Sequence, residues 1–455
     1  MISFLTSTIV LAVVYVTAVA AFAIVAALRV GGRRDDRGDD HEALAASRFT
    51  IPVSIVVPLT KGVASTGRAV AALLDLNYPE FEVIVVADGS SQAVIDELAR
   101  DWQLEAREFF YRKTIGTSEV RRIYRSARDS RLMVIDKAAT GYSDTLNCGV
   151  NVARYRYFMA VGPDVLFDRD ALLRVMTAAL RDPANVVGAS SHVEHGAEPA
   201  GDVGAGRQAG PDRQAGPDRQ TVTFMSRMMA LFQQLASARA LMDSRLAWRY
   251  LGAGLGPTGA IVVWRRDAVV KLNGFSAAAA DPAIDMMFRL QTRGVEGGGR
   301  FDRGVDVFGR VEPQSMAGAL RMSWRRQLAA LEVLAGALRH RTGALEFKTI
   351  AYFVASEVVT PLAELWIVIG IVAGASVGWF SWTAVILAIA LLAFGNAAVS
   401  AAALLLRGSG ANAPEEPELR RLLAAGPLEF VFYRPALAVA RLAATVSFLT
   451  PGSSR

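Results

Sequence analysis

Cysteine and histidine are scarce in this chain of 455 residues. The chain holds a single cysteine, Cys148, and four histidines. One cysteine excludes a disulfide framework and any metal site that needs several thiolates. Four histidines leave little room for a histidine-rich metal centre. The composition therefore argues against a metal site built on these two residue types.

A strong excess of positive charge is also lacking. Lysine and arginine total 49 against 43 aspartates and glutamates, which gives a formal net charge of +6. Aromatic and basic residues are not interleaved in the way that binding of single-stranded nucleic acid favours, so we expect no nucleic-acid partner. Arginines instead cluster beside apolar runs, a pattern typical of a cytoplasmic membrane face.

Apolar residues, by contrast, are abundant. They make up 52% of the chain, and the mean hydropathy is +0.30. Residues 2–28 form an uncharged run that is long enough to span a bilayer and exceeds the apolar core of a signal peptide. We predict a transmembrane helix over 1–30 and a linker over 31–50. The arginines after the run predict that the next domain lies on the cytoplasmic side of a cell (inner) membrane.

Residues 51–312 consist of short β-branched runs separated by helical segments. Continuous apolar strands of this kind are typical of a mostly parallel sheet covered by helices on both faces, so we expect an α/β fold. Ligands bind such sheets at the carboxyl ends of the strands, where Asp88 and Asp164 lie. The predicted strands are VSIVV (53–57), EVIVV (82–86), RLMVID (131–136) and YFMAVG (157–162).

A tandem AGPDRQ repeat interrupts this domain. It lies within residues 196–220 and reads RQAGPDRQAGPDRQ. A segment so rich in glycine and proline is typical of a flexible surface insertion, and we expect no catalytic role for it.

The C-terminal part of the chain returns to the membrane. Residues 313–345 carry apolar residues at helical spacing with arginines on the other face, which predicts an amphipathic helix on the membrane surface. Two transmembrane helices follow within 346–407. The tail, 408–455, has an apolar stretch at 428–449. Arg434 interrupts that stretch, which favours an interfacial helix over a further span.

Two acids, Glu357 and Glu364, lie in the first of these two C-terminal spans. Acidic groups are costly inside a bilayer and often functional there. Their seven-residue spacing puts both on one helix face, as a polar passage would require. A place near the helix end would alternatively let Glu357 reach the membrane interface.

Six stretches of residues 50–335 carry a further pattern. They are VSIVVP (53–58), NYPEFEVIVVADGSS (77–91), YSDTLNCGV (142–150), GPTGAIVVWRRDAVVKLNGF (256–275), Asp285-x-x-x-Arg289-Leu290 and VEPQSMAGALRMSW (311–324). In order and spacing they resemble the family 2 glycosyltransferases, which are membrane-bound inverting enzymes with a GT-A fold.

The resemblance implies a nucleotide-sugar donor, a glycan or lipid-linked acceptor, and Mg²⁺ or Mn²⁺ as cofactor. It implies a hexosyltransferase that works in cell-envelope or exopolysaccharide synthesis, with membrane lipid and other envelope-synthesis proteins as partners. In an enzyme of this family with rearranged groups, Asp164 alone would hold the metal, and Asp281 or Asp285 would serve as general base. Substrate-binding roles fall on five residues: Asp88, Asp144, Asn147, Arg321 and Trp324.

The motifs depart from the family pattern where charge is expected. The departures are Ala87-Asp88 for two acids, Gly162-Pro163-Asp164 for Asp-x-Asp, Pro282-Ala283 for Glu-Asp, Tyr142 for a lysine, and Leu320-Arg321-Met322-Ser323-Trp324 for Gln-Arg-x-Arg-Trp. Three interpretations stay open: an enzyme with rearranged groups, an inactive homologue that acts as a partner or scaffold in envelope glycan assembly, and a structural membrane component.

Each candidate residue also has an ordinary structural interpretation. Asp88 could cap a helix, and Asp164 could be a turn residue after proline. Asp285 and Arg289 have the i,i+4 spacing of a helix salt bridge. Trp324 could anchor an amphipathic helix at the membrane interface.

Overall fold

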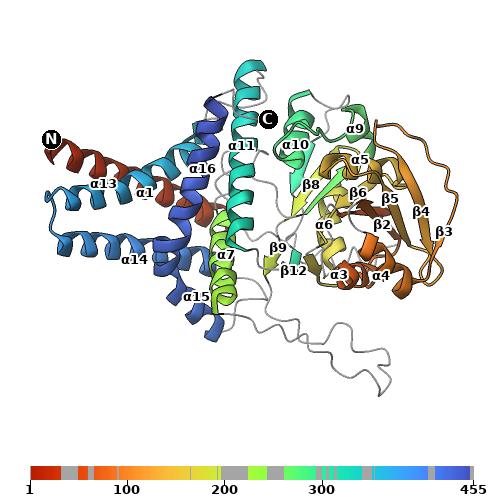
Figure 1. The fold of residues 1–455 in the computed structure, drawn as a ribbon, viewed down its shortest axis with the longest axis horizontal. Helices are drawn as coiled ribbons and strands as arrows, with labels where there is room; N and C mark the ends of the chain where they lie inside the picture. The colour runs from red at the N-terminus through yellow and green to blue at the C-terminus, as the bar shows by residue number, and fades with distance from the viewer. Residues whose placement is uncertain are drawn as a thin grey trace. The chain divides into compact units, whose positions relative to one another are not determined.

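The computed structural model describes most of the chain, in two compact units. We call Asp35–Gly206 with Pro257–Glu312 the sheet unit, and Met1–Arg34, Arg207–Gly256 and Pro313–Arg455 the helical unit (Figure 1). The described residues are 2–31, 50–59, 66–89, 92–163, 165–191, 193–195, 224–242, 261–293, 300–303, 307–311, 315–340, 351–352, 354–407 and 416–450. Asp164 and the repeat at 196–220 lie outside them, as does the side chain of Glu357.

The sheet unit is built on a mixed sheet whose centre is parallel. Over the described residues its nine strands lie in the order β11-β8-β10-β6-β1-β2-β5-β4-β3. The parallel centre consists of β6 (Tyr157–Ala160), β1 (Val53–Leu59), β2 (Phe81–Asp88) and β5 (Leu132–Lys137). The four predicted strands and the α/β class are therefore confirmed.

The outer strands of this sheet are partly antiparallel. One side is completed by β4 (Val120–Ser126) and β3 (Leu104–Ala106), and the other by β10 (Ile261–Arg265), β8 (Val186–Ser191) and β11 (Arg300–Arg303). A second, three-stranded sheet contains β7 (Val165–Phe167), β12 (Val307–Val311) and β9 (Val193–His195).

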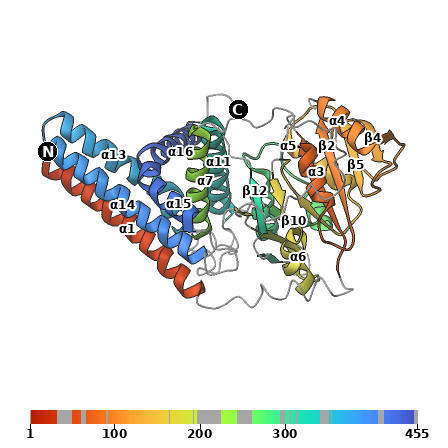
Figure 2. The ribbon, with the colours of Figure 1, turned by 90° about the horizontal axis from the view of Figure 1, so that it is seen from below.

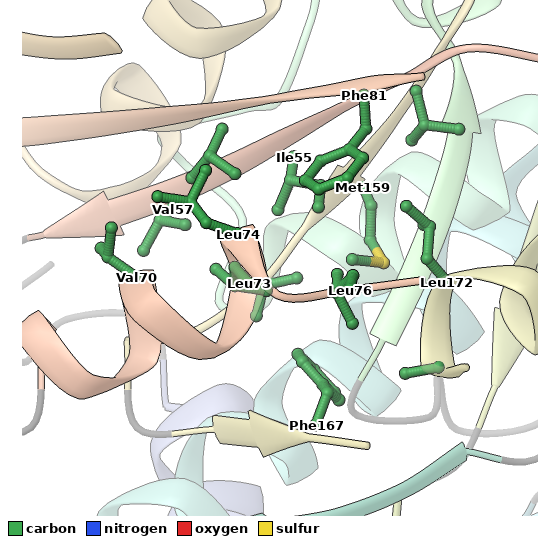
Figure 3. Close-up of a cluster of buried hydrophobic side chains, with 14 of the residues drawn as sticks. Ile55, Val57, Val70, Leu73, Leu74, Leu76, Phe81, Met159, Phe167 and Leu172 are labelled. Carbon is green, nitrogen blue, oxygen red and sulfur yellow. The ribbon is translucent and has the colours of Figure 1, made fainter. Parts of the chain in front are cut away.

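Helices cover both faces of the central strands. Every residue of β1 and β2 is therefore buried. The helices are α3 (Thr66–Leu74), α4 (Gln92–Trp102), α5 (Tyr142–Val152), α6 (Ala171–Arg181), α9 (Arg266–Lys271) and α10 (Pro282–Arg293). Ile55 and Val57 of β1 point into one core with Leu73 of α3 and Leu172 of α6 (Figure 3).

The opposite face of β1 packs against α5. Val56 points to that face, and a β-carbon added at Gly149 would lie only 2.3 Å from its Cγ1 atom. Glycine therefore lets α5 approach the sheet closely. Cys148, the neighbouring residue, is a free cysteine and is fully buried.

The register of the parallel strands brings their carboxyl ends to one edge. Leu59 of β1 pairs with Ala87 of β2, and Asp88 pairs with Lys137 of β5. On the other side of β1, the N–H of Val161 donates to the carbonyl of Val56, 3.0 Å away, just after β6 ends. We call this the carboxyl edge.

The helical unit consists of long, mostly apolar helices. They are α1 (Ile2–Gly31), α7 (Phe224–Met242), α11 (Met316–His340), η3 (Val354–Val359), α13 (Thr360–Ser376), α14 (Trp382–Arg407), α15 (Glu416–Leu428), η4 (Glu429–Tyr433) and α16 (Arg434–Leu449). Figure 2 shows α1, α13 and α14 running alongside one another. Gly370 of α13 makes room for Ile9 of α1, and Gly374 makes room for the ring of Phe380.

Four helical segments among the described residues are long and apolar enough to cross a membrane: 3–25, 354–376, 382–404 and 419–449. The first three lie within the stretches predicted as spans, 1–30 and 346–407. The fourth joins α15, η4 and α16, and it contains the stretch that the sequence favours as an interfacial helix. Its length of 31 residues and its hydropathy also suit a span.

The predicted amphipathic helix is α11, and its buried face packs on α16. Ser323 and Gln327 lie one turn apart on that face. Arg441 Nε donates to Ser323 Oγ over 3.4 Å, and Gln327 Nε2 donates to Thr445 Oγ1 over 3.3 Å. Much of the less exposed side of α11 is therefore used for a helix–helix contact.

A group of charged and polar side chains, most of them buried, lies among the helices. We call it the arginine cluster; its members are Arg239, Glu364, Asn396, Ser400, Glu429 and Arg434. Arg239 of α7 donates to Glu429, and its Nη1 lies 2.6 Å from Ser400 Oγ. Arg434 donates to Asn396, and its Nη2 lies 2.6 Å from Glu364 Oε1.

Candidate active site

Asp88 and Lys137 end two neighbouring parallel strands, and their side chains meet at the carboxyl edge. Lys137 Nζ lies 2.7 Å from Asp88 Oδ1, although its side chain has no exposed surface. The backbone N–H of Thr140 donates to the same oxygen over 2.9 Å, and that of Gly141 donates to Asp88 Oδ2 over 2.9 Å. Asp88 thus ties β2 to the loop before α5.

Asp144, in the first turn of α5, completes this group. Its Oδ2 lies 2.9 Å from Lys137 Nζ and also accepts from the hydroxyls of Thr140, 2.6 Å away, and Ser118, 2.7 Å away. One ammonium therefore serves two carboxylates. We call Asp88, Asp144 and Lys137, with Thr140 and Ser118, the lysine cluster.

Both acids of the lysine cluster are stabilised in the ionised form. Burial would raise the pKa of Asp88, but the hydrogen bonds and charge of Lys137 and the two backbone N–H groups outweigh it and lower the pKa. Burial opposes ionisation of Asp144 as well, yet hydrogen bonds from Thr140, Lys137 and Ser118 leave its pKa lowered. At neutral pH the cluster holds two negative charges and one positive charge.

This donor set does not suit a divalent cation. No group of three or more histidine, cysteine, aspartate or glutamate side chains with a metal-binding arrangement occurs in the part of the chain that the structure describes. The carboxylate oxygens of Asp88 and Asp144 already accept from Lys137 and neighbouring groups, and a cation would have to displace that ammonium. The predicted ligand, Asp164, lies outside the described residues.

Asn147, predicted to bind substrate, holds the backbone of Phe275. Its Nδ2 donates to the Phe275 carbonyl over 2.9 Å, and its Oδ1 accepts from the Phe275 N–H over 2.7 Å. Gly274, at φ +74°, passes so close that a β-carbon there would lie 2.4 Å from Asn147 Oδ1. The amide of Asn147 is thus used to fix a turn of the chain.

That turn belongs to a segment that follows α5 back to the carboxyl edge. Arg266 Nε donates to the carbonyl of Val150, near the C-terminal end of α5, over 2.8 Å. Further along the chain Phe275 meets Asn147, and then Ser143 Oγ donates to the carbonyl of Ser276 over 2.9 Å. The segment therefore runs from the end of α5 toward its start, beside Asp144.

Asp281 begins α10 shortly after this segment. Its Oδ1 accepts from the backbone N–H groups of Ala283, 3.0 Å away, and Ile284, 3.2 Å away. Together with Pro282 in the first helical position, this is an N-cap. The described hydrogen bonds of the Asp281 carboxylate all go to Oδ1.

Asp285 forms the i,i+4 salt bridge that its spacing allows. Its Oδ2 lies 2.8 Å from Arg289 Nε. Arg289 also donates to the carbonyls of Leu272, 2.9 Å away, and Gly274, 2.8 Å away. The ion pair thus connects α10 to the same turn that Asn147 holds.

The two remaining candidates lie on α11, in the helical unit. Arg321 is exposed, and its Nε donates to the carbonyl of Ala317 one turn earlier, 3.2 Å away. Trp324 is half-buried. Of the eight residues predicted for the site, the structure brings Asp88 and Asp144 into one cluster, and it places Asn147 and the two acids of α10 along the neighbouring segment.

Sequence reasoning missed Lys137, Thr140 and Ser118. A signal for the lysine was present, because the strand that reads RLMVID continues into Lys137 just as the preceding strand ends in Asp88. Parallel neighbours with charged residues of opposite sign at their carboxyl ends favour an ion pair. Ser118 and Thr140 lie in loops and carry no comparable signal.

Comparisons with known proteins indicate a family and a fold. Residues 54–232 match the model of the family described as "Glycosyl transferase family 2". No curated protein matches the chain.

Solved structures give a similar result. A mannosyltransferase from Pyrobaculum calidifontis, solved with GDP-Man and Mn²⁺, is 16% identical, covers 97% of this chain and 99% of its own, and superposes with a TM-score of 0.52. Residues 1–349 of S. aureus TarS are 13% identical, cover 84% of this chain and 91% of their own, and give a TM-score of 0.34. Residues 54–232 therefore match glycosyl transferase family 2, and the sheet unit has a GT-A-like fold.

Proposed function

We propose that this chain is a membrane-anchored glycosyltransferase of the hexosyltransferase type. It transfers a sugar from a nucleotide sugar to a glycan or lipid-linked acceptor in cell-envelope or exopolysaccharide synthesis. The family match supports sugar transfer, and the four long apolar helices support attachment to the cell membrane. The observation that carries the proposal is the lysine cluster at the carboxyl edge, where open α/β sheets bind their ligands.

The charge of the lysine cluster suggests which part of the donor it binds. Two carboxylates around one ammonium leave a net charge of −1 at a partly exposed position. Such a site attracts O–H and N–H donors, as a ribose and a base provide, and it repels a diphosphate. In this proposal Asp88 and Asp144 therefore contact the nucleoside, and Asn147 shapes the adjoining wall through Phe275.

The diphosphate needs positive charge from elsewhere. We keep Mg²⁺ or Mn²⁺ at Asp164 as the proposed source, and such a cation would neutralise the leaving group when bound. Arg321 and Trp324 stay proposed for the diphosphate and the acceptor sugar. The neighbour from Pyrobaculum was solved with GDP-Man and Mn²⁺, so this is the first donor and cation to test.

The general base is proposed to be Asp281 or Asp285. A base must accept the proton of the acceptor hydroxyl, so it needs a carboxylate oxygen that can reach it. Asp281 suits this better, because its described hydrogen bonds leave Oδ2 available, whereas Asp285 is paired with Arg289.

The contacts of Asp281 and Asp285 also support a second candidate, an inactive homologue with a scaffold role. Both acids of α10 make contacts that stabilise the fold, and alanine stands at position 283 where the family pattern has an acid. A chain that had lost transfer could keep both contacts for structural reasons.

Calorimetry on the full chain in lipid nanodiscs tests the proposal. GDP-mannose and UDP-sugars are titrated with and without Mn²⁺, and transfer is assayed by release of the nucleoside diphosphate. We expect binding that the Asp88→Asn variant weakens at least tenfold. Absence of binding under all conditions would refute the donor site. Binding without turnover, unchanged by Asp164→Ala, would favour the scaffold.

A further inference from the structure

We infer that Lys137 is a positioning residue of the donor site, because its ammonium holds the Asp88 and Asp144 carboxylates side by side without contacting the ligand itself. This inference rests on the proposed function, since it takes the nucleoside of the donor as the ligand of the two acids. Neither the family pattern nor the sequence motifs assign a role to Lys137.

The burial of the three side chains separates the positioning residue from the binding residues. Lys137 has no exposed side-chain surface, whereas Asp88 is 7% and Asp144 is 18% exposed. A ligand that approaches the carboxyl edge therefore meets carboxylate oxygens and not the ammonium. Lys137 Nζ is instead ringed by four oxygens, at 2.7 to 2.9 Å: those of both carboxylates, the Ala138 carbonyl and the Thr140 hydroxyl.

The distances show why the two acids need this cation. Both carboxylates contact one nitrogen, at 2.7 and 2.9 Å, so their nearest oxygens are no farther apart than the sum of these distances. Two carboxylates that close repel each other, and one of them then takes up a proton far more readily. Without Lys137, a proton would have to replace the ammonium to keep the pair together.

Other titratable groups near the cluster do not supply this charge. Burial raises the pKa of the Cys148 thiol to about 12, so it stays neutral. Lys113 directs its Nζ to the carbonyl of Thr117, 2.5 Å away. Asp136, beside Lys137 on β5, faces Arg121 at 4.0 Å.

The test compares donor affinity of the full chain between pH 5 and pH 8.5 for the wild type, Lys137→Met and Lys137→Met with Asp144→Asn. The Lys137→Met variant should lose affinity relative to the wild type by about tenfold more at pH 8 than at pH 5, since one pKa unit of coupling corresponds to a factor of ten. In the double variant this pH dependence should disappear, because one repelling charge is gone.

Thermal unfolding gives a readout that needs no ligand. The raised pKa in Lys137→Met means that its folded state binds more protons than its unfolded state, so its stability should fall as pH rises from 5 to 8. A deficit in melting temperature that does not change with pH would overturn the inference. Absence of donor binding by the wild type would instead refute the proposed function and leave this readout intact.

Two further variants guard against loss of folding. Lys137→Gln keeps hydrogen bonds without the charge and should reproduce the trend with pH. Lys137→Arg keeps the charge and should abolish the trend, even where its size lowers affinity. If Lys137→Arg and Lys137→Gln show the same pH dependence, the charge of Lys137 has no positioning role.

Discussion

Each compact unit contains a buried cationic side chain, Lys137 in the sheet unit and Arg239 in the helical unit. The two are held differently. In the lysine cluster one ammonium serves two carboxylates that reach the surface. In the arginine cluster two guanidinium groups serve two carboxylates, and Glu429, the partner of Arg239, has no exposed surface at all. The first is unbalanced in charge. The second is balanced, with Arg239 and Glu429 enclosed and Arg434 and Glu364 partly exposed.

This difference separates a binding site from a structural contact. A carboxylate that exceeds its counter-charge and reaches solvent can still accept hydrogen bonds from a ligand. A charge-balanced network, in which each carboxylate already has its own guanidinium, has less to offer a ligand, and it makes one helix arrangement more favourable than others. The arginine cluster joins α7, α13, α14, η4 and α16, which is the arrangement expected of a contact that holds helices together.

The arginine cluster is also not fully satisfied. Among the described side chains, Asn396 Nδ2 and Glu429 Oε2 are buried and accept or donate no hydrogen bond. Unpaired buried polar atoms are costly, so the cluster depends strongly on the contacts that it does make. Removal of one cation should therefore have a larger effect here than in the lysine cluster.

The largest expected effect is that of Arg239→Met. The substitution leaves Glu429 as a buried charge without its partner, and such a change costs about 3–5 kcal/mol. We expect a large drop in the melting temperature of the full chain in detergent, measured by fluorescence-detected size-exclusion chromatography. Arg227→Met is the matched control, because Arg227 is exposed on the same helix; it should change little.

A second substitution tests whether charge is the cause. Arg239→Met combined with Glu429→Leu replaces the pair with apolar side chains, which is often close to neutral in buried ion pairs. Most of the lost stability should therefore return. If the single variant melts like the wild type, the arginine cluster does not hold the helices together.

The next largest effect concerns acids that lie outside both clusters. Asp281→Asn keeps the N-cap of α10, because asparagine caps as well as aspartate, but it cannot act as a base. If Asp281 is the base, kcat should fall by about 10²–10⁴-fold with no change in melting temperature. Asp285→Asn is the parallel variant. Equal, unchanged kcat in both would exclude the two acids as bases.

The sequence predicted the central sheet well and the site less completely. Runs such as EVIVV are apolar at all but one position, which favours a buried parallel strand, and β2 is buried throughout. The ends of strands are harder to predict, because a charged residue there is compatible with a turn, a cap or an ion pair. Lys137 was missed for this reason.

Contacts between distant residues could not be predicted at all. Asn147 and Phe275 are 128 positions apart, and their hydrogen bonds depend on how α5 lies against the turn after α9. Arg239 and Glu429 are 190 positions apart. Glu364 was expected to line a polar passage or to have another function in a span, and no pattern indicated that Arg434 would pair with it.

A smaller effect is expected where an uncharged contact holds the sheet unit. Gly274→Ala would place a methyl group 2.4 Å from Asn147 Oδ1 at a φ of +74°. Strain of this kind costs about 1–3 kcal/mol, so the melting temperature should fall by several degrees. Gly116→Ala is the control, since a β-carbon at Gly116 meets nothing within 4 Å. Equal melting temperatures would show that the Asn147 turn adapts without cost.

The smallest effect is the response of the lysine cluster to acid. The pKa values of Asp88 and Asp144 are lowered in the folded chain, so each acid adds stability above its unfolded pKa of about 3.9 and loses it as pH falls through the folded value. Asp144→Asn should therefore cost stability near pH 6 and progressively less as pH falls below about 4, in melting curves of the full chain. A deficit that is the same at pH 6 and pH 3.5 would mean that Asp144 contributes by packing and not by charge. The lysine cluster would then resemble the arginine cluster in being a structural contact, and the contrast between the two would no longer support a donor site.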